Sequence, residues 1–358
     1  MPEDDQAARR VREALTDDAS PYPARYGARF GADGLPLDPD DGADAEIIAW
    51  QVNSPYYVAP PPERRHKHII DVLIRERAVR LSQSKLWGLY RVGLNKLLGY
   101  KRAKAMVDVA GRMNAGDAFA HASGLLSMKL DVTGLEHVPQ AGAFILAVNH
   151  PTGIADGLAI HDALAPVRPD VVIFVNADAI RLNPRLTPKL IPVEWREDKK
   201  SRAKSRETLK ATKAAFEEGR CVVIFPSGRL AYMDDDAPGG PTLTERAWMT
   251  TAVNLARRYG VPIVPAHITS RNSWLYYWFN NVDEELRNMT LFYELLNKKG
   301  QTFEIRIGEA VPVDALEGDD QAATEALQAY VTDEAGGVRA GTSFGAWRAR
   351  LPGAAPAR

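Results

Sequence analysis

The sequence holds a single cysteine, Cys221, among 358 residues. One cysteine excludes a disulfide framework within the chain and a cysteine-rich zinc site. Long hydrophobic runs are also missing, because no window supplies the ~20 nearly uncharged apolar residues that span a bilayer. The N-terminal residues contain no apolar h-region, so we expect no secretory signal. These absences predict a cytoplasmic protein that at most lies on a membrane surface.

An excess of one charge is missing as well. Lysine and arginine total 45, aspartate and glutamate total 46, and the net charge is −1. A globally basic nucleic-acid binder is therefore disfavoured, and we expect no nucleic-acid partner. Apolar residues make up 45% and charged residues 25% of the chain, as in ordinary globular proteins.

The charges are nevertheless unevenly distributed. Residues 1–60 carry a net charge of −7 together with many prolines and glycines, which predicts a loosely ordered acidic extension. Residues 63–107 carry twelve basic and three acidic residues, a net charge of +9. Apolar residues recur there with helical spacing, so residues 63–120 are expected to form basic amphipathic helices, arranged as a hairpin. Such a surface suits an anionic membrane, and it equally suits packing on the protein's own domain.

From about residue 128 short apolar runs alternate with helical stretches, the pattern of an α/β domain. We expect this domain to span 128–335, with a mostly parallel central sheet of about seven strands flanked by helices, and 336–358 to form a tail. The expected strands are Lys129–Thr133, Ala143–Asn149, Val171–Asn176, Leu190–Trp195, Cys221–Pro226, Pro262–Thr269 and Phe303–Ile307. The expected helices are Asp156–Leu164, Ser201–Glu218, Thr244–Tyr259, Glu284–Lys298 and 318–335.

One predicted strand ends in a histidine. The apolar run AFILAV continues directly into Asn149-His150-Pro151-Thr152-Gly153, and Asp156 follows at the expected start of a helix. In open α/β folds ligands bind at the carboxyl edge of the sheet, where this imidazole would lie. Asp156 could fix the tautomer of His150 and leave Nε2 as a base. A buried structural histidine beside a plain helix cap explains an isolated pair equally simply.

Two later strands add to this pattern. Cys221–Phe225 runs into Pro226-Ser227-Gly228-Arg229, which places a cation at the same sheet edge. The guanidinium group suits bidentate contact with phosphate. A third run, Val261–Pro265, has prolines that indicate an edge or a strand end. The ordered set is more specific than any one of its parts.

This ordered set resembles the glycerolipid acyltransferase family, which contains the lysophosphatidic acid acyltransferases. Asn149-His150 with Asp156 resembles the family's His-Asp catalytic motif. Phe225–Arg229 resembles its phosphate-binding block, Val261–Pro265 its later proline-containing block, and Val132–Pro139 the entry to its first motif. The resemblance covers roughly residues 128–312.

The sequence departs from the common family pattern at two places. Five residues separate His150 from Asp156, where the common motif has four. This HX5D form is similar to the hemolysin-like and ornithine-lipid branch of the family. Ser227 stands where the common block has glutamate, which weakens the expectation that lysophosphatidic acid is the acceptor.

The resemblance implies an acyltransferase that needs no metal and no cofactor. His150, oriented by Asp156, would be the base, and acyl-CoA or acyl carrier protein would donate the acyl group to a hydroxyl of a lysolipid. The protein would lie peripherally on the inner face of the cytoplasmic membrane, with residues 63–107 on the anionic surface. Arg181, in the region of the acceptor-binding motif, is equally well explained as a surface arginine. The implied substrate-binding residues are Asn149, Thr152, Gly153, Gly157, Arg181, Ser227, Gly228 and Arg229.

Two other functions stay open at this point. A lipid-binding protein could keep the fold without the chemistry, since the spacing from His150 to Asp156 is unusual. A serine hydrolase could use Ser227, although the glycine that a nucleophile elbow has two residues earlier is replaced by Phe225. The acceptor is equally open among phospholipid, ornithine lipid, glycolipid and other hydroxylated lipids.

Overall fold

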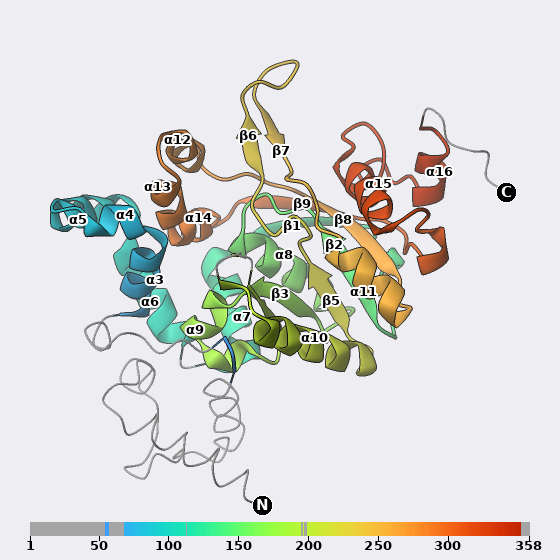
Figure 1. Ribbon diagram of the computed structural model, residues 1–358, viewed down its shortest axis with the longest axis horizontal. Helices are drawn as coiled ribbons and strands as arrows, with labels where there is room; N and C mark the ends of the chain where they lie inside the picture. Colours follow the sequence, from blue (N-terminus) through green and yellow to red (C-terminus); the bar gives the residue numbers. More distant parts are fainter. Residues whose placement is uncertain (1–53, 57–67, 112, 195, 197–198, 352–358) are drawn as a thin grey trace, which may run out of the picture. The chain divides into compact units, whose positions relative to one another are not determined.

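The computed structural model describes residues 54–56, 68–111, 113–194, 196 and 199–351 (Figure 1). Most of the expected extension 1–60, residues 63–67 of the expected basic region and residues 352–358 lie outside the described residues. The chain forms two compact units, and each is built from three segments. The first unit comprises 1–124, 175–210 and 279–296, and the second 125–174, 211–278 and 297–358. The domain boundaries expected from the sequence stay a prediction.

A seven-stranded sheet, flanked by helices, forms the centre of the fold, in the order β1-β9-β8-β2-β5-β3-β4. Four of the strand pairs are parallel, and β8 with β9 is antiparallel. The expected α/β class with a mostly parallel sheet is therefore confirmed. The strands are β1 (Lys129–Thr133), β2 (Phe144–Val148), β3 (Val172–Asn176), β4 (Leu190–Val193), β5 (Cys221–Ile224), β8 (Ile263–Thr269) and β9 (Thr302–Ile307).

Burial along the strands follows from their places in the sheet. Every residue of β2 is buried, because β8 and β5 pair with both of its edges and neighbouring elements cover its faces. Strand β1 lies at an edge of the sheet, and its residues alternate between exposed and half-buried. The strand that leads into His150 is thus a rigid central strand.

Helices follow the strands as the sequence pattern predicts. Helices α11 and α15 pack on the strands of the second unit, where α11 contacts β2 and β8 and α15 contacts β8. Helix α11 ends at Gly260, which has the left-handed conformation with φ 65°. The helices from residue 154 onward are α8 (Ile154–Leu164), α9 (Asp178–Leu182), α10 (Arg202–Glu217), α11 (Thr251–Tyr259), α12 (Trp274–Val282), α13 (Glu284–Met289), α14 (Leu291–Asn297), α15 (Asp320–Thr332) and α16 (Phe344–Arg348).

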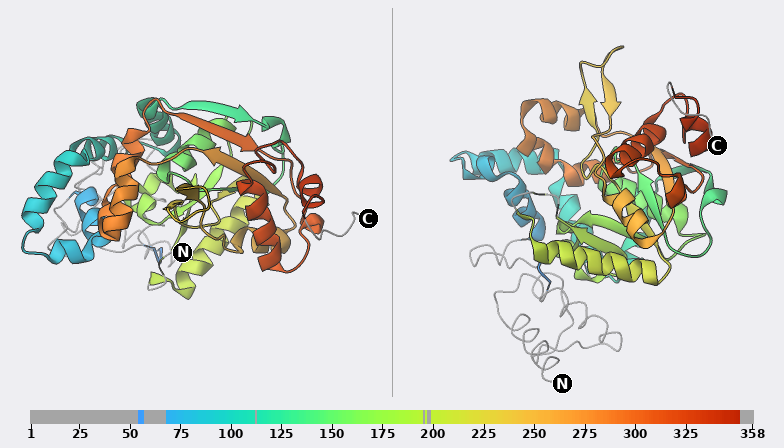
Figure 2. Two further views of the ribbon diagram at one scale, coloured as in Figure 1. Left: turned by 90° about the horizontal axis from the view of Figure 1, so that it is seen from above. Right: turned by 45° about the vertical axis from the view of Figure 1, so that its right-hand side comes forward.

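The segment before α11 differs from the expectation. The sequence predicts one helix from Thr244 to Tyr259, but the helix begins only at Thr251. Strands β6 (Tyr232–Asp234) and β7 (Thr242–Thr244) pair as an antiparallel hairpin that projects away from the sheet (Figures 1 and 2). Residues 245–250 return from this hairpin to α11 as irregular backbone. The prediction was wrong there, because the contacts that hold this backbone come from distant residues.

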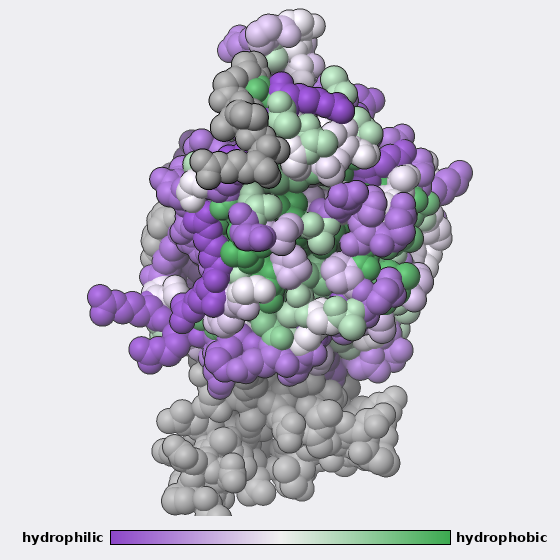
Figure 3. All heavy atoms as spheres, turned by 90° about the vertical axis from the view of Figure 1, so that its right-hand side faces the viewer, coloured by the Kyte–Doolittle hydropathy of each residue, from purple (hydrophilic) through white to green (hydrophobic). Residues whose placement is uncertain are grey.

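The expected tail also differs, since its first part is packed. The rings of Phe344 and Trp347 of α16 are buried against Tyr330 of α15, with ring centroids 5.2 Å and 5.3 Å apart. The side of the molecule that carries α15 and α16 faces the viewer in Figure 3, where hydrophobic residues gather near the centre of a hydrophilic surface.

The basic region is helical, as expected, but its described residues form five helices where a two-helix hairpin was expected. They are α3 (Ile69–Arg77), α4 (Val79–Gln83), α5 (Trp87–Leu97), α6 (Tyr100–Ala110) and α7 (Ala115–Leu126). Gly99, with φ 63°, allows the turn between α5 and α6. In the part of the chain that the structure describes, no helix combines the length and the apolar character needed to cross a membrane.

Candidate active site

His150 lies just beyond the carboxyl end of β2, where the chain turns toward α8. Its imidazole is 19% exposed and stacks on the ring of Phe225, with centroids 4.2 Å apart. Its carbonyl oxygen accepts a hydrogen bond of 2.9 Å from the N–H of Ala231. The imidazole is therefore held at the sheet edge by both its ring and its backbone, while part of it still reaches solvent.

Asp156 occupies the first turn of α8 and is completely buried. Its Oδ2 atom accepts the N–H groups of Thr152 and Gly153, each at 2.8 Å, and its Oδ1 atom accepts the hydroxyl of Thr152. The carboxylate thus folds the Thr152–Gly153 loop around itself. This loop carries the chain from β2 to α8, so Asp156 has a structural task beside any chemical one.

The structure brings His150 and Asp156 together. Nδ1 of His150 lies 3.0 Å from Oδ2 of Asp156, which is ion-pair distance. The Nδ1 atom is buried and is not aligned as a hydrogen-bond donor to this carboxylate. The extra residue in the HX5D spacing does not separate the two groups, because the loop between them is wound onto the carboxylate.

The turn after β5 packs against the same imidazole. Phe225 stacks on the ring of His150, and Ser227, buried in the turn, donates its hydroxyl to the carbonyl oxygen of Arg229 at 2.8 Å. Arg229 itself is exposed. The predicted histidine and the predicted phosphate-binding block therefore meet at one edge of the sheet. The hydroxyl proton of Ser227 is directed at a carbonyl group, an arrangement that does not favour Ser227 as a nucleophile.

Two glycines of the site have backbone conformations that favour glycine. Gly153 has φ 98°, and a Cβ atom there would lie 3.0 Å from Cδ2 of Leu230. Gly228 has φ 61°, and a Cβ atom there would lie 2.6 Å from Cε of Met249. Gly157, inside α8, would meet only ordinary contacts with Ile173 at 3.9 Å. The first two glycines are required by the shape of the site, whereas the reason for Gly157 is not steric.

The side-chain amide of Asn149 bonds the backbone of β8. Its Nδ2 atom donates to the carbonyl oxygen of Ile268 at 2.9 Å, and its Oδ1 atom accepts the N–H of the same residue at 2.7 Å. These bonds fasten the end of β2 to the end of β8. Asn149 thereby fixes the strand end from which His150 projects.

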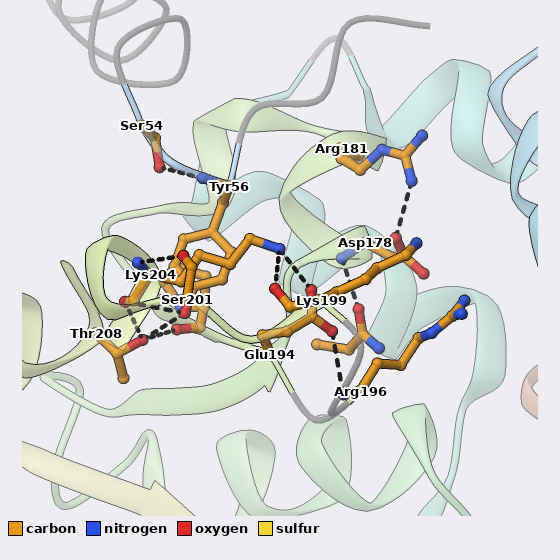
Figure 4. Close-up of polar contacts among 12 residues, drawn as sticks. Ser54, Tyr56, Asp178, Arg181, Glu194, Arg196, Lys199, Ser201, Lys204 and Thr208 are labelled. Atoms are coloured by element: carbon orange, nitrogen blue, oxygen red, sulfur yellow. Dashed lines mark hydrogen bonds and ion pairs between the residues drawn. The ribbon is translucent and has the colours of Figure 1, made fainter. Parts of the chain in front are cut away.

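Arg181 belongs to the first unit and is buried. Its Nη1 atom donates to Glu76 at 2.7 Å and to Asp178 at 3.0 Å, and Nη2 donates to Glu76 at 3.1 Å. Arg181 points toward Asp178 in Figure 4. Burial opposes the charge of Asp178, but Arg77 and Arg181 together lower its pKa. The guanidinium is thus engaged by carboxylates, and a head-group role for Arg181 rests on the sequence prediction alone.

Sequence reasoning missed Glu245. The N–H group of His150 donates to both carboxylate oxygens of Glu245 at 3.2 Å, and the indole Nε1–H of Trp248 donates at 3.3 Å. Burial raises the pKa of Glu245, while the nearby hydroxyl of Ser227 and the N–H of His150 lower it. No local signal marks this residue, because the sequence places it in a predicted helix, where an acid is ordinary.

The described residues around His150 include no group of side chains that could hold a metal ion. Across the described ranges of the chain, no three His, Cys, Asp or Glu side chains gather as a metal ion would need. Cys221 begins β5, is fully buried, and has its pKa raised by that burial.

Comparisons with known proteins bear on the family of this chain. Residues 129–269 match the family model described as acyltransferase, a span that includes His150, Asp156 and the turn after β5. Residues 129–269 therefore form a domain of the acyltransferase family. The resemblance read from the sequence is thereby confirmed.

Two relatives carry a more specific description. A lyso-glycine lipid O-acyltransferase of Phocaeicola vulgatus is 27% identical over 193 residues, which is 52% of this chain and 66% of that protein. A protein of the same description from Bacteroides thetaiotaomicron is 25% identical over 193 residues, 52% of this chain and 67% of that protein. The chain thus spans about two thirds of the length of these relatives.

A solved structure, the 1-acyl-sn-glycerophosphate acyltransferase PlsC of Thermotoga maritima, is also similar. It is 14% identical, covers 71% of this chain and 95% of its own, and superposes with a TM-score of 0.36.

Proposed function

We propose that this protein moves a fatty acyl group from a thioester, acyl-CoA or acyl carrier protein, to a hydroxyl group of a lysolipid. The observation that carries the proposal is the 3.0 Å approach of Nδ1 of His150 to a fully buried carboxylate of Asp156. A carboxylate at that nitrogen favours the tautomer with Nε2 free to accept a proton, and it stabilises the imidazolium that forms. The same distance argues against a lipid-binding protein that keeps only the fold.

The proposed reaction needs no covalent enzyme intermediate. Nε2 of His150 takes the proton of the acceptor hydroxyl as its oxygen forms a bond to the thioester carbonyl carbon. The tetrahedral intermediate then collapses, the carbon–sulfur bond breaks, and the proton passes from the imidazolium to the departing thiolate. General-base assistance of this kind contributes about 10²–10⁴-fold to a rate. Positioning of the two substrates would supply much of the remainder.

The developing oxyanion needs hydrogen-bond donors that are not already used. The N–H groups of Thr152 and Gly153 serve Asp156, so they are poor candidates. The N–H groups of Ile154 and Ala155, in the first turn of α8, have no acceptor within the helix. We assign the oxyanion to this helix end, where the helix dipole also favours negative charge.

Arg229 is the proposed contact for an anionic group of the lipid. It is exposed, and it lies between Phe225, whose ring stacks on His150, and Ala231, whose N–H donates to the carbonyl oxygen of His150. The descriptions of the relatives make a lyso-glycine lipid, whose anionic group is a carboxylate, the first acceptor to test. Arginine pairs bidentately with carboxylate as well as with phosphate, so Arg229 serves either head group.

Helix α5 supplies a surface for a membrane. Leu89 and Val92 are 71% and 65% exposed, and the basic residues Arg91 and Lys96 lie exposed on the same helix. A helix with exposed aliphatic and basic residues binds an anionic lipid surface through both burial and charge. We place the protein peripherally on the inner face of the cytoplasmic membrane through this helix.

Purified protein tests the transfer reaction directly. Release of free thiol from palmitoyl-CoA or palmitoyl carrier protein is followed with a lyso-glycine lipid or lysophosphatidic acid in detergent micelles. We expect thiol release that depends on the acceptor and is lost in His150→Ala. Acceptor-independent release, or full activity in that variant, would refute the assignment.

The membrane surface is tested by co-sedimentation with vesicles. We expect binding to vesicles that contain phosphatidylglycerol, weaker binding at high salt, and loss of binding in the double variant Leu89→Glu, Val92→Glu. Equal binding of this variant and the parent would remove α5 from the proposal.

A further inference from the structure

The carboxylate of Glu245 lies against the backbone of His150, just beyond the end of β2. Both of its oxygens accept the N–H of His150 at 3.2 Å, and Trp248 donates its indole N–H at 3.3 Å. The residue is half-buried and lies in the irregular segment between β7 and α11. Eighty-eight positions separate Gly157, the end of the first motif, from Glu245. Only the fold brings this acid to the site.

No permanent cation accompanies this carboxylate. Among the described residues, Glu245 forms no ion pair with lysine or arginine. The group that acts on it electrostatically is the imidazole of His150, which is charged only when it is protonated. A carboxylate removed from water without a cation is unfavourable, and evolution tolerates such groups chiefly where they serve function. The cation it would need forms only when His150 takes up a proton.

The hydroxyl of Ser227, which is buried in the turn after β5, lies next to the carboxylate of Glu245. A carboxylate introduced at residue 227 would therefore lie close to the space that the carboxylate of Glu245 occupies.

We propose that Glu245 is a positioning residue for His150, a second carboxylate beside Asp156 that holds the strand end and stabilises the imidazolium during acyl transfer. The inference rests on the proposed function. Glu245 neither takes up the proton nor forms a bond with a substrate; the proton moves only between the acceptor, His150 and the leaving thiolate. Its contribution is a fixed negative charge near the imidazole and a fixed backbone at His150.

The variant Glu245→Gln separates charge from shape. Glutamine keeps an oxygen that accepts the N–H of His150, so the strand end stays in place, but the charge is gone. We expect kcat for palmitoyl transfer to a lyso-glycine lipid to fall at least about tenfold, with KM for both substrates within twofold of the parent. We expect Tm to stay the same or to rise, because a half-buried acid without a cation has been removed. The control Glu309→Gln, an exposed residue outside the site, leaves kcat and Tm unchanged.

A relocation variant tests whether the charge or the particular residue matters. Glu245→Ala alone should lose more activity than Glu245→Gln, because it also releases the N–H of His150. Adding Ser227→Glu to Glu245→Ala returns a carboxylate to the vacated space, and we expect it to recover at least about threefold in kcat. Unchanged kcat in Glu245→Gln would overturn the inference, and so would a loss of kcat that runs parallel to a fall in Tm.

A second readout does not depend on turnover. Diethyl pyrocarbonate modifies neutral imidazole, and mass spectrometry follows its reaction with His150 at about pH 6, near the ordinary titration range of histidine. Among the described residues, the carboxylates of Asp156 and Glu245 contact His150, and removal of the second carboxylate should disfavour the imidazolium. We expect Glu245→Gln to react at least about twofold faster than the parent. If the parent shows no acyl transfer but the two modification rates still differ, only the proposed function is refuted. Equal modification rates of Glu245→Gln and the parent would overturn the inference.

Discussion

The substitution Asp156→Asn separates the two tasks of the buried carboxylate. An asparagine oxygen in the place of Oδ2 still accepts the N–H groups of Thr152 and Gly153, and its NH2 group faces the hydroxyl of Thr152, which can accept in turn. The loop around residue 156 therefore keeps its hydrogen bonds. What is lost is the charge beside Nδ1 of His150.

The expected magnitudes follow from these contacts. The two N–H bonds become neutral rather than charge-assisted, which costs about 2 kcal/mol of stability. Unit charges 3.0 Å apart at an effective dielectric constant of about 20 interact by about 5 kcal/mol. The His150 side chain is 19% exposed, so solvent screening reduces this value, and we expect kcat to fall about 10²–10³-fold.

Thiol release and urea unfolding measure the two effects on the same protein. Asp162→Asn, on the same helix but outside the site, is the matched control and should leave kcat unchanged. Activity of Asp156→Asn within threefold of the parent would refute the reasoning that the charge beside His150 drives proton transfer. A variant that fails to fold would instead show that the hydrogen bonds of the loop depend on the charge, which the geometry does not predict.

Three further outcomes are expected. Iodoacetamide should leave Cys221 unmodified in the folded protein at neutral pH, because burial raises its pKa and excludes the reagent; rapid labelling before unfolding contradicts this. Arg168→Met should lower the free energy of unfolding by about 2–4 kcal/mol, since Arg168 bonds the carbonyls of Pro139, Gly142 and Gly219 and pairs with Asp170. Arg168 lowers the pKa of Asp170, so the pair stabilises the fold above about pH 4, and this stability is lost as the pH falls further. The free energy of unfolding of Arg168→Met should therefore fall less on acidification than that of the parent. Urea titrations at several pH values would measure this difference. Gly153→Ala should cost about 1–3 kcal/mol and reduce kcat, because φ 98° is unfavourable for alanine and the displaced N–H serves Asp156; unchanged Tm and kcat would show that the loop tolerates another path.

The sequence alone determined where the strands of the sheet lie along the chain and which motif residues follow them. Buried strands read as continuous apolar runs, so β2 and β5 were expected where they lie, each followed by the residues of a motif. The pairing of His150 with Asp156 was also expected, because six positions and a helix start are local information. Prolines and glycines marked the turns, because the preference of these residues for turns is also local information.

The tertiary structure decided which distant groups share the site. Asn149 binds the backbone of Ile268, and Glu245 binds the backbone of His150 across 95 positions. Arg181 pairs with Glu76 in place of facing solvent. None of these contacts follows from periodicity, because a hydrogen bond between remote segments depends on strand order and loop path rather than on the residues nearby. The helical pattern even placed Glu245 in a helix, and the hairpin that precedes it is what carries the acid to the imidazole.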